Sequence, residues 1–160
     1  MSFSVDELLK KGIIVKKLGS PEEEFVKEKM KKEFDMKFDK KELIVGYKDN
    51  KEPKRHEFDL VSEDGNIVIE VKGGKGIVGK DNENSAGIST CFHDCYLLTK
   101  IEAKEKILAL TNKDMFDIFK KKSDGIINND NIQVRYFDME RGRKITALHL
   151  KGKKLYHKKL

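Results

Sequence analysis

The chain has 160 residues and a formal net charge of +6, and its charged fraction of 39% slightly exceeds its apolar fraction of 38%. This composition does not require disorder and predicts a single domain over residues 1–160. The positive charge favours nucleic acid as a partner, although lysines spread along the chain also describe an ordinary solvated surface. Two cysteines exclude a disulfide framework, and no apolar run reaches the length of a signal peptide or membrane span, so we expect a soluble, cytoplasmic protein without a membrane partner.

The N-terminal part predicts two helices separated by a short strand. A capping-box pattern predicts a helix over residues 5–11, followed by a strand over residues 13–15. A longer helix is predicted over residues 21–35, because Ser20 can cap it and Pro21 suits its first position. Its apolar face, at four-residue spacing, comprises Val26, Met30 and Phe34.

Beyond residue 40 the apolar residues change to the period of β-strands. Three short runs, over residues 43–47, 56–61 and 67–71, predict a β-meander. Its second turn is expected to be a tight two-residue hairpin loop formed by Asp64 and Gly65.

The second half of the chain predicts helices alternating with strands. The expected elements are a loop over residues 73–85, a helix over 85–104, a buried strand over 106–111 and a helix over 112–122. Two late strands, over residues 132–138 and 144–150, predict a C-terminal β-hairpin. A basic tail follows over residues 151–160.

The predicted hairpin determines which side chains face one another. With Asp64 and Gly65 in the loop, Asp59 faces Glu70 and Glu57 faces Lys72. Strict alternation then gives one packed side and one charged side. The packed side is expected to comprise Phe58, Leu60, Ile67, Ile69 and Val71. The charged side is expected to comprise Glu57, Asp59, Glu70 and Lys72.

Two opposed carboxylates repel each other unless a cation lies between them. Hard oxygen ligands from Asp59 and Glu70 suit Mg²⁺ or Mn²⁺. Lys72, on the same face, can steady an attacking water and the charge that develops on a phosphate. The alternative is a merely solvated outer face, since acid-x-Lys strings are frequent in this chain. Only Glu70-Val71-Lys72, however, closes an apolar strand with an aspartate opposite.

Residues 56–61 and 67–73 resemble motifs II and III of the PD-(D/E)XK nuclease superfamily, which includes restriction endonucleases and archaeal Holliday-junction resolvases. In size and layout the chain is most similar to resolvase-like or Mrr-like members. The resemblance spans residues 20–111 and implies an α/β, restriction-endonuclease-like αβββαβ core with a mixed central sheet flanked by helices. Residues 112–160 would form an extension. Phe58 stands where the family often has proline.

The resemblance also implies roles for individual residues. Asp59, Glu70 and the backbone carbonyl of Val71 would ligate the metal, and Lys72 would be the motif lysine. Members often place a glutamate early in the first core helix, aimed at the same metal. Glu23 is expected to face the sheet, because it precedes Val26 and Met30 by three and seven residues. Glu22 and Glu24 compete for this role, and Glu23 alternatively only completes the capping box.

Basic and polar residues outside the hairpin are candidates for nucleic-acid binding. They are Lys75, Lys80, His93, Arg141 and Arg143. The alternatives are a flexible loop and a solvated tail. The sequence thus predicts a Mg²⁺- or Mn²⁺-dependent endonuclease acting on DNA, with a homodimer as a possible assembly. A basic nucleic-acid-binding module without turnover is the second hypothesis, and an interaction domain with solubilising charges is the third.

Overall fold

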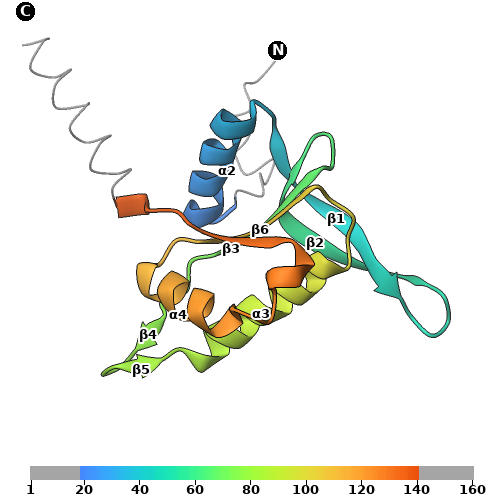
Figure 1. Ribbon diagram of the computed structural model, residues 1–160. Helices are drawn as coiled ribbons and strands as arrows, with labels where there is room; N and C mark the ends of the chain where they lie inside the picture. Colours follow the sequence, from blue (N-terminus) through green and yellow to red (C-terminus); the bar gives the residue numbers. More distant parts are fainter. Residues whose placement is uncertain (1–18, 141–160) are drawn as a thin grey trace, which may run out of the picture.

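The computed structural model describes residues 19–140 (Figure 1). The elements in chain order are α2 (Pro21–Phe34), β1 (Phe38–Tyr47), β2 (Pro53–Ser62), β3 (Ile67–Lys72), β4 (Ile77–Val78), β5 (Asn82–Glu83), α3 (Ser85–Thr99), β6 (Glu105–Leu110), α4 (Lys113–Ser123), the 3-10 helix η1 (Asn128–Asp130) and β7 (Ile132–Tyr136). No helix in this range is long and apolar enough to cross a lipid bilayer. The helix expected over residues 5–11, the strands over 13–15 and 144–150 and the basic tail lie outside the described residues.

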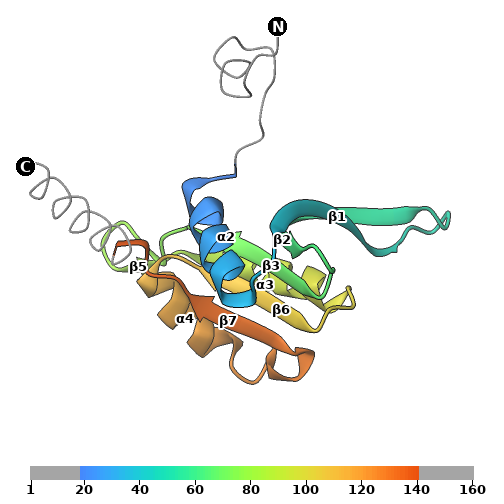
Figure 2. The same ribbon diagram turned by 90° about the horizontal axis from the view of Figure 1, so that it is seen from above.

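A mixed five-stranded sheet forms the centre of the fold, in the order β1-β2-β3-β6-β7. The β1–β2 and β2–β3 pairs are antiparallel, whereas the β3–β6 and β6–β7 pairs are parallel. Helix α2 covers one face, and α3 and α4 cover the other (Figures 1 and 2). The predicted α/β class with a mixed central sheet flanked by helices is confirmed.

Helix α2 forms where its sequence signals predict it. Ser20 Oγ accepts a hydrogen bond from the Glu23 backbone N–H at 3.2 Å, and Pro21 occupies the first turn. The helix ends at Asp35, which adopts the left-handed conformation. Val26 and Met30 are buried on the face towards the sheet, as their spacing predicts.

Apolar side chains pack against both faces of the sheet. Under α2 the cluster contains Val26, Met30, Phe38, Leu60, Ile67, Ile69, Val71, Ile107, Ala109 and Phe137. Clusters under α3 and α4 include Phe58, Val61, Val68, Cys91, Cys95, Leu98, Leu108, Leu110 and Phe119. The expectation that one face of the β2–β3 hairpin packs while the other only collects charge is therefore wrong, because α3 covers the charged face.

Strand β7 is an edge strand of the central sheet among the described residues, and its predicted hairpin partner over residues 144–150 lies outside them. It pairs in parallel with β6, from Lys106 opposite Ile132 to Leu110 opposite Tyr136, and so extends the central sheet. Residues 139 and 140 are helical where a turn towards the second strand was expected. The predicted loop over residues 73–85 also differs, because it contains the small antiparallel pair β4 and β5.

The β2–β3 turn is longer than predicted but keeps the predicted register. The strands end at Ser62 and begin again at Ile67, so four residues rather than two form the loop. Gly65, with φ of 73°, donates its N–H to the Ser62 carbonyl at 2.9 Å. Both loops are centred on the same peptide bond. Leu60 is therefore opposite Ile69 and Val61 is opposite Val68, as the predicted register requires. The two strands are not paired beyond Leu60, but the Asp59 carboxylate still lies close enough to Glu70 to raise its pKa.

A β-bulge in β2 changes which side chains face α3. Asp39 pairs with Val61, but Lys41 pairs with Phe58, so β2 contains one more residue than β1 over this stretch. Phe58 consequently packs under α3 and not with Leu60 under α2, which corrects the predicted alternation. Beyond the bulge, β1 and β2 pair without a third strand and project from the sheet as an arm (Figures 1 and 2).

Candidate active site

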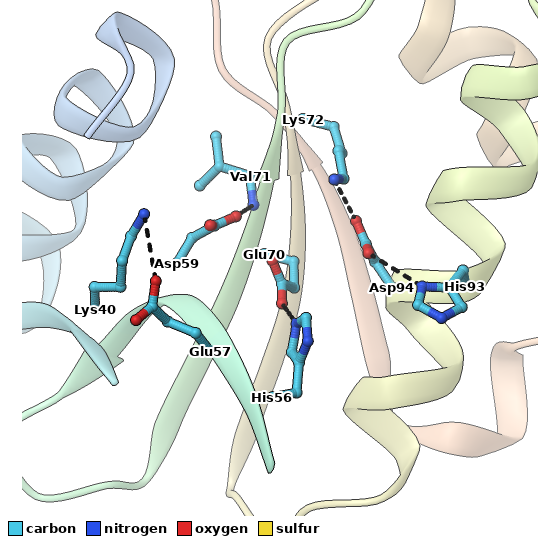
Figure 3. A network of polar contacts seen from close by, with 9 residues as sticks. All are labelled: Lys40, His56, Glu57, Asp59, Glu70, Val71, Lys72, His93 and Asp94. Atoms are coloured by element: carbon cyan, nitrogen blue, oxygen red, sulfur yellow. Dashed lines mark hydrogen bonds and ion pairs between the residues drawn. The ribbon is translucent and has the colours of Figure 1, made fainter. Parts of the chain in front are cut away.

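The predicted motif lies at the C-terminal end of β3, where β2 and β3 stop pairing (Figure 3). The Val71 backbone N–H donates a hydrogen bond to Asp59 Oδ2 at 2.8 Å, so the carboxylate takes the place of a backbone partner. The N–H and C=O of one strand residue point towards the same neighbouring strand. The Val71 carbonyl is therefore directed to the side of the sheet where Asp59 lies.

Glu70 is the most buried acid of this region, with 3% of its side chain exposed. Burial, and then the hydrogen bond and charge of Asp59, raise the pKa of Glu70 to about 10. His56 Nε2 lies 2.7 Å from Glu70 Oε1, and the edge-to-face contact of its ring with Phe58 holds it there. Glu70 therefore holds its proton near neutral pH unless a cation replaces it.

Lys72 lies on the same face of β3 as Glu70 and pairs with Asp94 of α3. The distance between Lys72 Nζ and Asp94 Oδ2 is 3.1 Å, and the Asp94 side chain is 6% exposed. This oxygen is buried without a well-aligned hydrogen bond. Burial alone would lower the pKa of Lys72, but the charge of Asp94, followed by those of Glu70 and Asp59, raises it. Burial raises the pKa of Asp94.

A second set of charges lies on the opposite face, under α2. Lys40 Nζ is 3.4 Å from Glu23 Oε2 and 4.0 Å from Glu57 Oε1 (Figure 3 draws the Glu57 contact). Burial alone would lower the pKa of Lys40, but Glu23, Asp59 and Glu57 raise it. The expectation that Glu57 faces Lys72 is wrong, because the bulge turns these two side chains to opposite faces. We call His56, Glu70, Lys72 and Asp94 the inner group, and Lys40, Glu23 and Glu57 the outer group.

The glutamates of α2 are divided between two places. Glu23, the residue predicted to face the metal, has the Lys40 ammonium as its partner. Glu22 instead lies against Gly73, directly after Lys72: a Cβ at Gly73 would be 2.6 Å from Glu22 Cγ. Of the competing glutamates, Glu22 is thus the one in contact with the end of the motif.

The predicted nucleic-acid-binding residues that the structure describes are all exposed. Lys80 lies in the turn between β4 and β5, and 65% of the His93 side chain is exposed beside Asp94. The Lys75 carbonyl accepts a hydrogen bond from Asn84 Nδ2 at 2.9 Å, which ties the loop to the start of α3. Arg141 and Arg143 lie outside the described residues.

The sequence pattern does not predict His56, Lys40 or Asp94 as site residues. For Asp94 a signal exists: it follows Cys91 by three residues and precedes Leu98 by four, so it occupies the apolar stripe of its helix. A charged residue in such a stripe is buried and requires a partner. For His56 and Lys40, only the pairing of β1 with β2 brings them to the site.

Comparison with protein-family models, with curated proteins and with solved structures found no match to this chain. The chemistry of the site therefore has to follow from its own residues. Over the region where the sequence resemblance applies, the described order is α2, β1, β2, β3, β4, β5, α3 and β6, so the short pair β4 and β5 lies between β3 and α3.

The donor set fits an open site for a hard divalent cation. Two facing carboxylates, of which one is buried, and a carbonyl directed to the same side offer oxygen ligands, and Mg²⁺ keeps several waters in such sites. Within residues 19–140 no group of three or more His, Cys, Asp or Glu side chains is arranged to hold a metal. Cys91 and Cys95 are buried in the α3 core. A closed zinc site is not formed by these residues.

Proposed function

We propose that this chain is a Mg²⁺- or Mn²⁺-dependent endonuclease that hydrolyses phosphodiester bonds of DNA on a restriction-endonuclease-like scaffold. The observation that carries the proposal is the meeting of Asp59 and Glu70 at the end of β3, with Lys72 at the next position on the same face. Burying Glu70 beside a second acid is unfavourable for a structural role alone. It is expected at a cation site that performs chemistry.

Each residue has a definite role in the proposed reaction. The carboxylates of Asp59 and Glu70 and the carbonyl of Val71 hold the ion, and His56 fixes the Glu70 carboxyl group. When bound, the ion supplies Lewis-acid polarisation of the phosphate and lowers the pKa of a water molecule. Lys72, 33% exposed, presents its ammonium to the phosphate charge that develops during attack.

The charge of the chain supports DNA as the partner. The net charge is +6, and exposed Lys75 and Lys80 follow the motif along the chain, where they can contact backbone phosphates. Such contacts position DNA without reading its sequence. We infer a homodimer where both strands of a duplex are cut, since residues 19–140 of one chain supply one such site.

A second candidate is a nucleic-acid-binding module without turnover. It is favoured by the internal pairing of the acids: Glu70 contacts His56, and Asp59 accepts the Val71 N–H. Asp94 likewise pairs with Lys72. A scaffold that binds no metal would keep these contacts.

Incubation of the full chain with plasmid, branched and single-stranded DNA, with and without Mg²⁺ or Mn²⁺, tests both candidates. We expect metal-dependent cleavage that is lost in Asp59→Asn and Lys72→Ala variants. Lys27→Ala is a matched control, because Lys27 is also 33% exposed and also pairs with an aspartate, Asp39. Binding without cleavage by every form would select the module and reject the enzyme.

A further inference from the structure

The pairing of Lys72 with Asp94 is unexpected from the position of Lys72 on its strand. Glu70 and Lys72 are two residues apart on the same face of β3, which corresponds to about 7 Å along a strand. A lysine side chain spans this distance, and Lys72 is close enough to feel the charges of both Glu70 and Asp59. Its ammonium nevertheless lies against Asp94 of α3, and Figure 3 shows it directed away from the two facing carboxylates.

Stability does not account for Asp94. The residue lies between the buried Cys91 and Cys95 on α3, and its own side chain is 6% exposed. Its Oδ2 atom is buried without a well-aligned hydrogen bond, which costs stability. An apolar residue at this position would extend the core of α3. The carboxylate therefore stabilises the packing of α3 on the sheet less than an apolar side chain would.

The contact does have a consequence for the neighbouring acids. Apart from Asp94, the acids whose charges act on the Lys72 ammonium are Glu70 and Asp59. An ammonium between these carboxylates would neutralise them and would occupy the place that a divalent cation requires. His56 cannot prevent this, because it contacts only one oxygen of Glu70.

We propose that Asp94 is a positioning residue that draws Lys72 away from Asp59 and Glu70 and thereby keeps this carboxylate pair open for a divalent cation. The inference rests on the proposed function, since it concerns the metal that Asp59 and Glu70 would hold. Asp94 acts through Lys72 and does not itself contact the cation. Lys72 is at the same time kept at the edge of the site, where a phosphate can reach it.

Calorimetric titration of the full chain with Mn²⁺ tests the proposal through a double-mutant cycle. We expect Asp94→Asn to weaken Mn²⁺ binding about tenfold, the magnitude typical of residues that orient metal ligands. Lys72→Ala should strengthen binding only slightly in the wild-type background. In the Asp94→Asn background the same substitution should restore binding to about the wild-type affinity, because the competing ammonium is gone.

Lys40→Ala is the matched control. The charge of Asp59 also raises the pKa of Lys40, but Asp94 does not act on this residue. It should change Mn²⁺ affinity by the same factor with and without Asp94→Asn. Far-UV circular dichroism verifies the fold of each variant, and Asp94→Ser replaces Asp94→Asn if the latter does not fold.

Three outcomes would contradict the inference, and they are distinguishable. If Lys72→Ala increased Mn²⁺ affinity by the same factor in both backgrounds, Asp94 would act on the metal only through its long-range negative charge and not through Lys72. Unchanged Mn²⁺ affinity in Asp94→Asn would remove any role for Asp94 at the metal site. Absence of Mn²⁺ binding by the wild-type chain would instead overturn the proposed function, and with it this inference.

Discussion

The inner and outer groups are two sets of polar contacts on opposite faces of the β2–β3 hairpin, and they differ in burial. In the inner group, Glu70 and Asp94 are 3% and 6% exposed. In the outer group, Glu23 and Glu57 are 18% and 46% exposed. Exposed pairs contribute little to stability, whereas buried charges reduce it unless they are completely paired. The burial of the inner group therefore favours the proposed functional role, whereas the more exposed pairs of the outer group are ordinary surface ion pairs.

The largest expected contrast between the groups is in cleavage. Glu70→Gln should reduce metal-dependent DNA cleavage at least 100-fold, because it removes a ligand of the proposed ion. Glu57→Gln makes the same chemical change in the outer group and should alter the rate only a few-fold. Initial cleavage rates at saturating Mg²⁺ measure both. Similar losses in the two variants would show that burial does not separate the groups by function.

The next contrast is in the pH dependence of stability in the absence of divalent cations. The folded-state pKa of Glu70, about 10, is above its ordinary value of 4.5, so the folded protein holds this proton more tightly than the unfolded chain. The stabilisation is complete below pH 4.5 and is lost as pH rises towards 10. We expect a slope of at most about 1.4 kcal/mol per pH unit between these values.

Urea unfolding at several pH values, with EDTA present, measures this slope. Glu70→Gln should flatten it, whereas Glu57→Gln should retain it. A wild-type stability that increases from pH 5 to pH 9 would contradict the burial argument for Glu70.

A smaller effect distinguishes Asp94 from ordinary ion-pair residues. At pH 7, Asp94→Asn should increase the free energy of unfolding by about 1 kcal/mol, because it removes a buried charge with a poorly satisfied oxygen. Loss of the ion pair with Asp94 should cost Lys72 little free energy, since its ammonium is partly exposed and can be hydrated. Denaturant unfolding measures the change, and a clear destabilisation would indicate that Asp94 serves the fold itself.

The smallest effect is expected for the outer group. Lys40→Ala should lower the free energy of unfolding by less than about 1 kcal/mol, as is usual for exposed ion pairs. The difference from the wild-type chain should disappear in 1 M NaCl, where charges are screened within about 3 Å. A salt-independent loss would mean that Lys40 stabilises the fold through packing.

The parts of the site that are close together in sequence could be predicted. The pairing of Leu60 with Ile69 depends on the centre of the loop around Asp64 and Gly65, so the extra loop residues left the register unchanged and Asp59 near Glu70. The orientation of Phe58 could not be predicted, because the bulge is defined by the pairing of β2 with β1. Strict alternation along one strand contains no information about such an inserted residue.

The contribution of α3 was the least predictable part. Asp94 is brought to Lys72 only by the crossover that carries the chain from β3 to β6. The helix itself was predicted, although it ends at Thr99 and not at residue 104. Its apolar stripe identifies residues that face the sheet, and a polar residue within that stripe is informative only when its partner is known. The same holds for Glu22, which reaches Gly73 through the packing of α2.

The bulge in β2 also limits how the length of this chain can vary. Deleting one residue between His56 and Leu60 would rotate the projecting arm by half a turn about its axis, so that Phe58 would leave the α3 core and His56 would face away from Glu70. The tip of the arm, over residues 48–52, has no such restriction, because nothing beyond it depends on its length. Insertions and deletions should therefore be tolerated at the tip, whereas those near the bulge in β2 should disrupt the fold and the site.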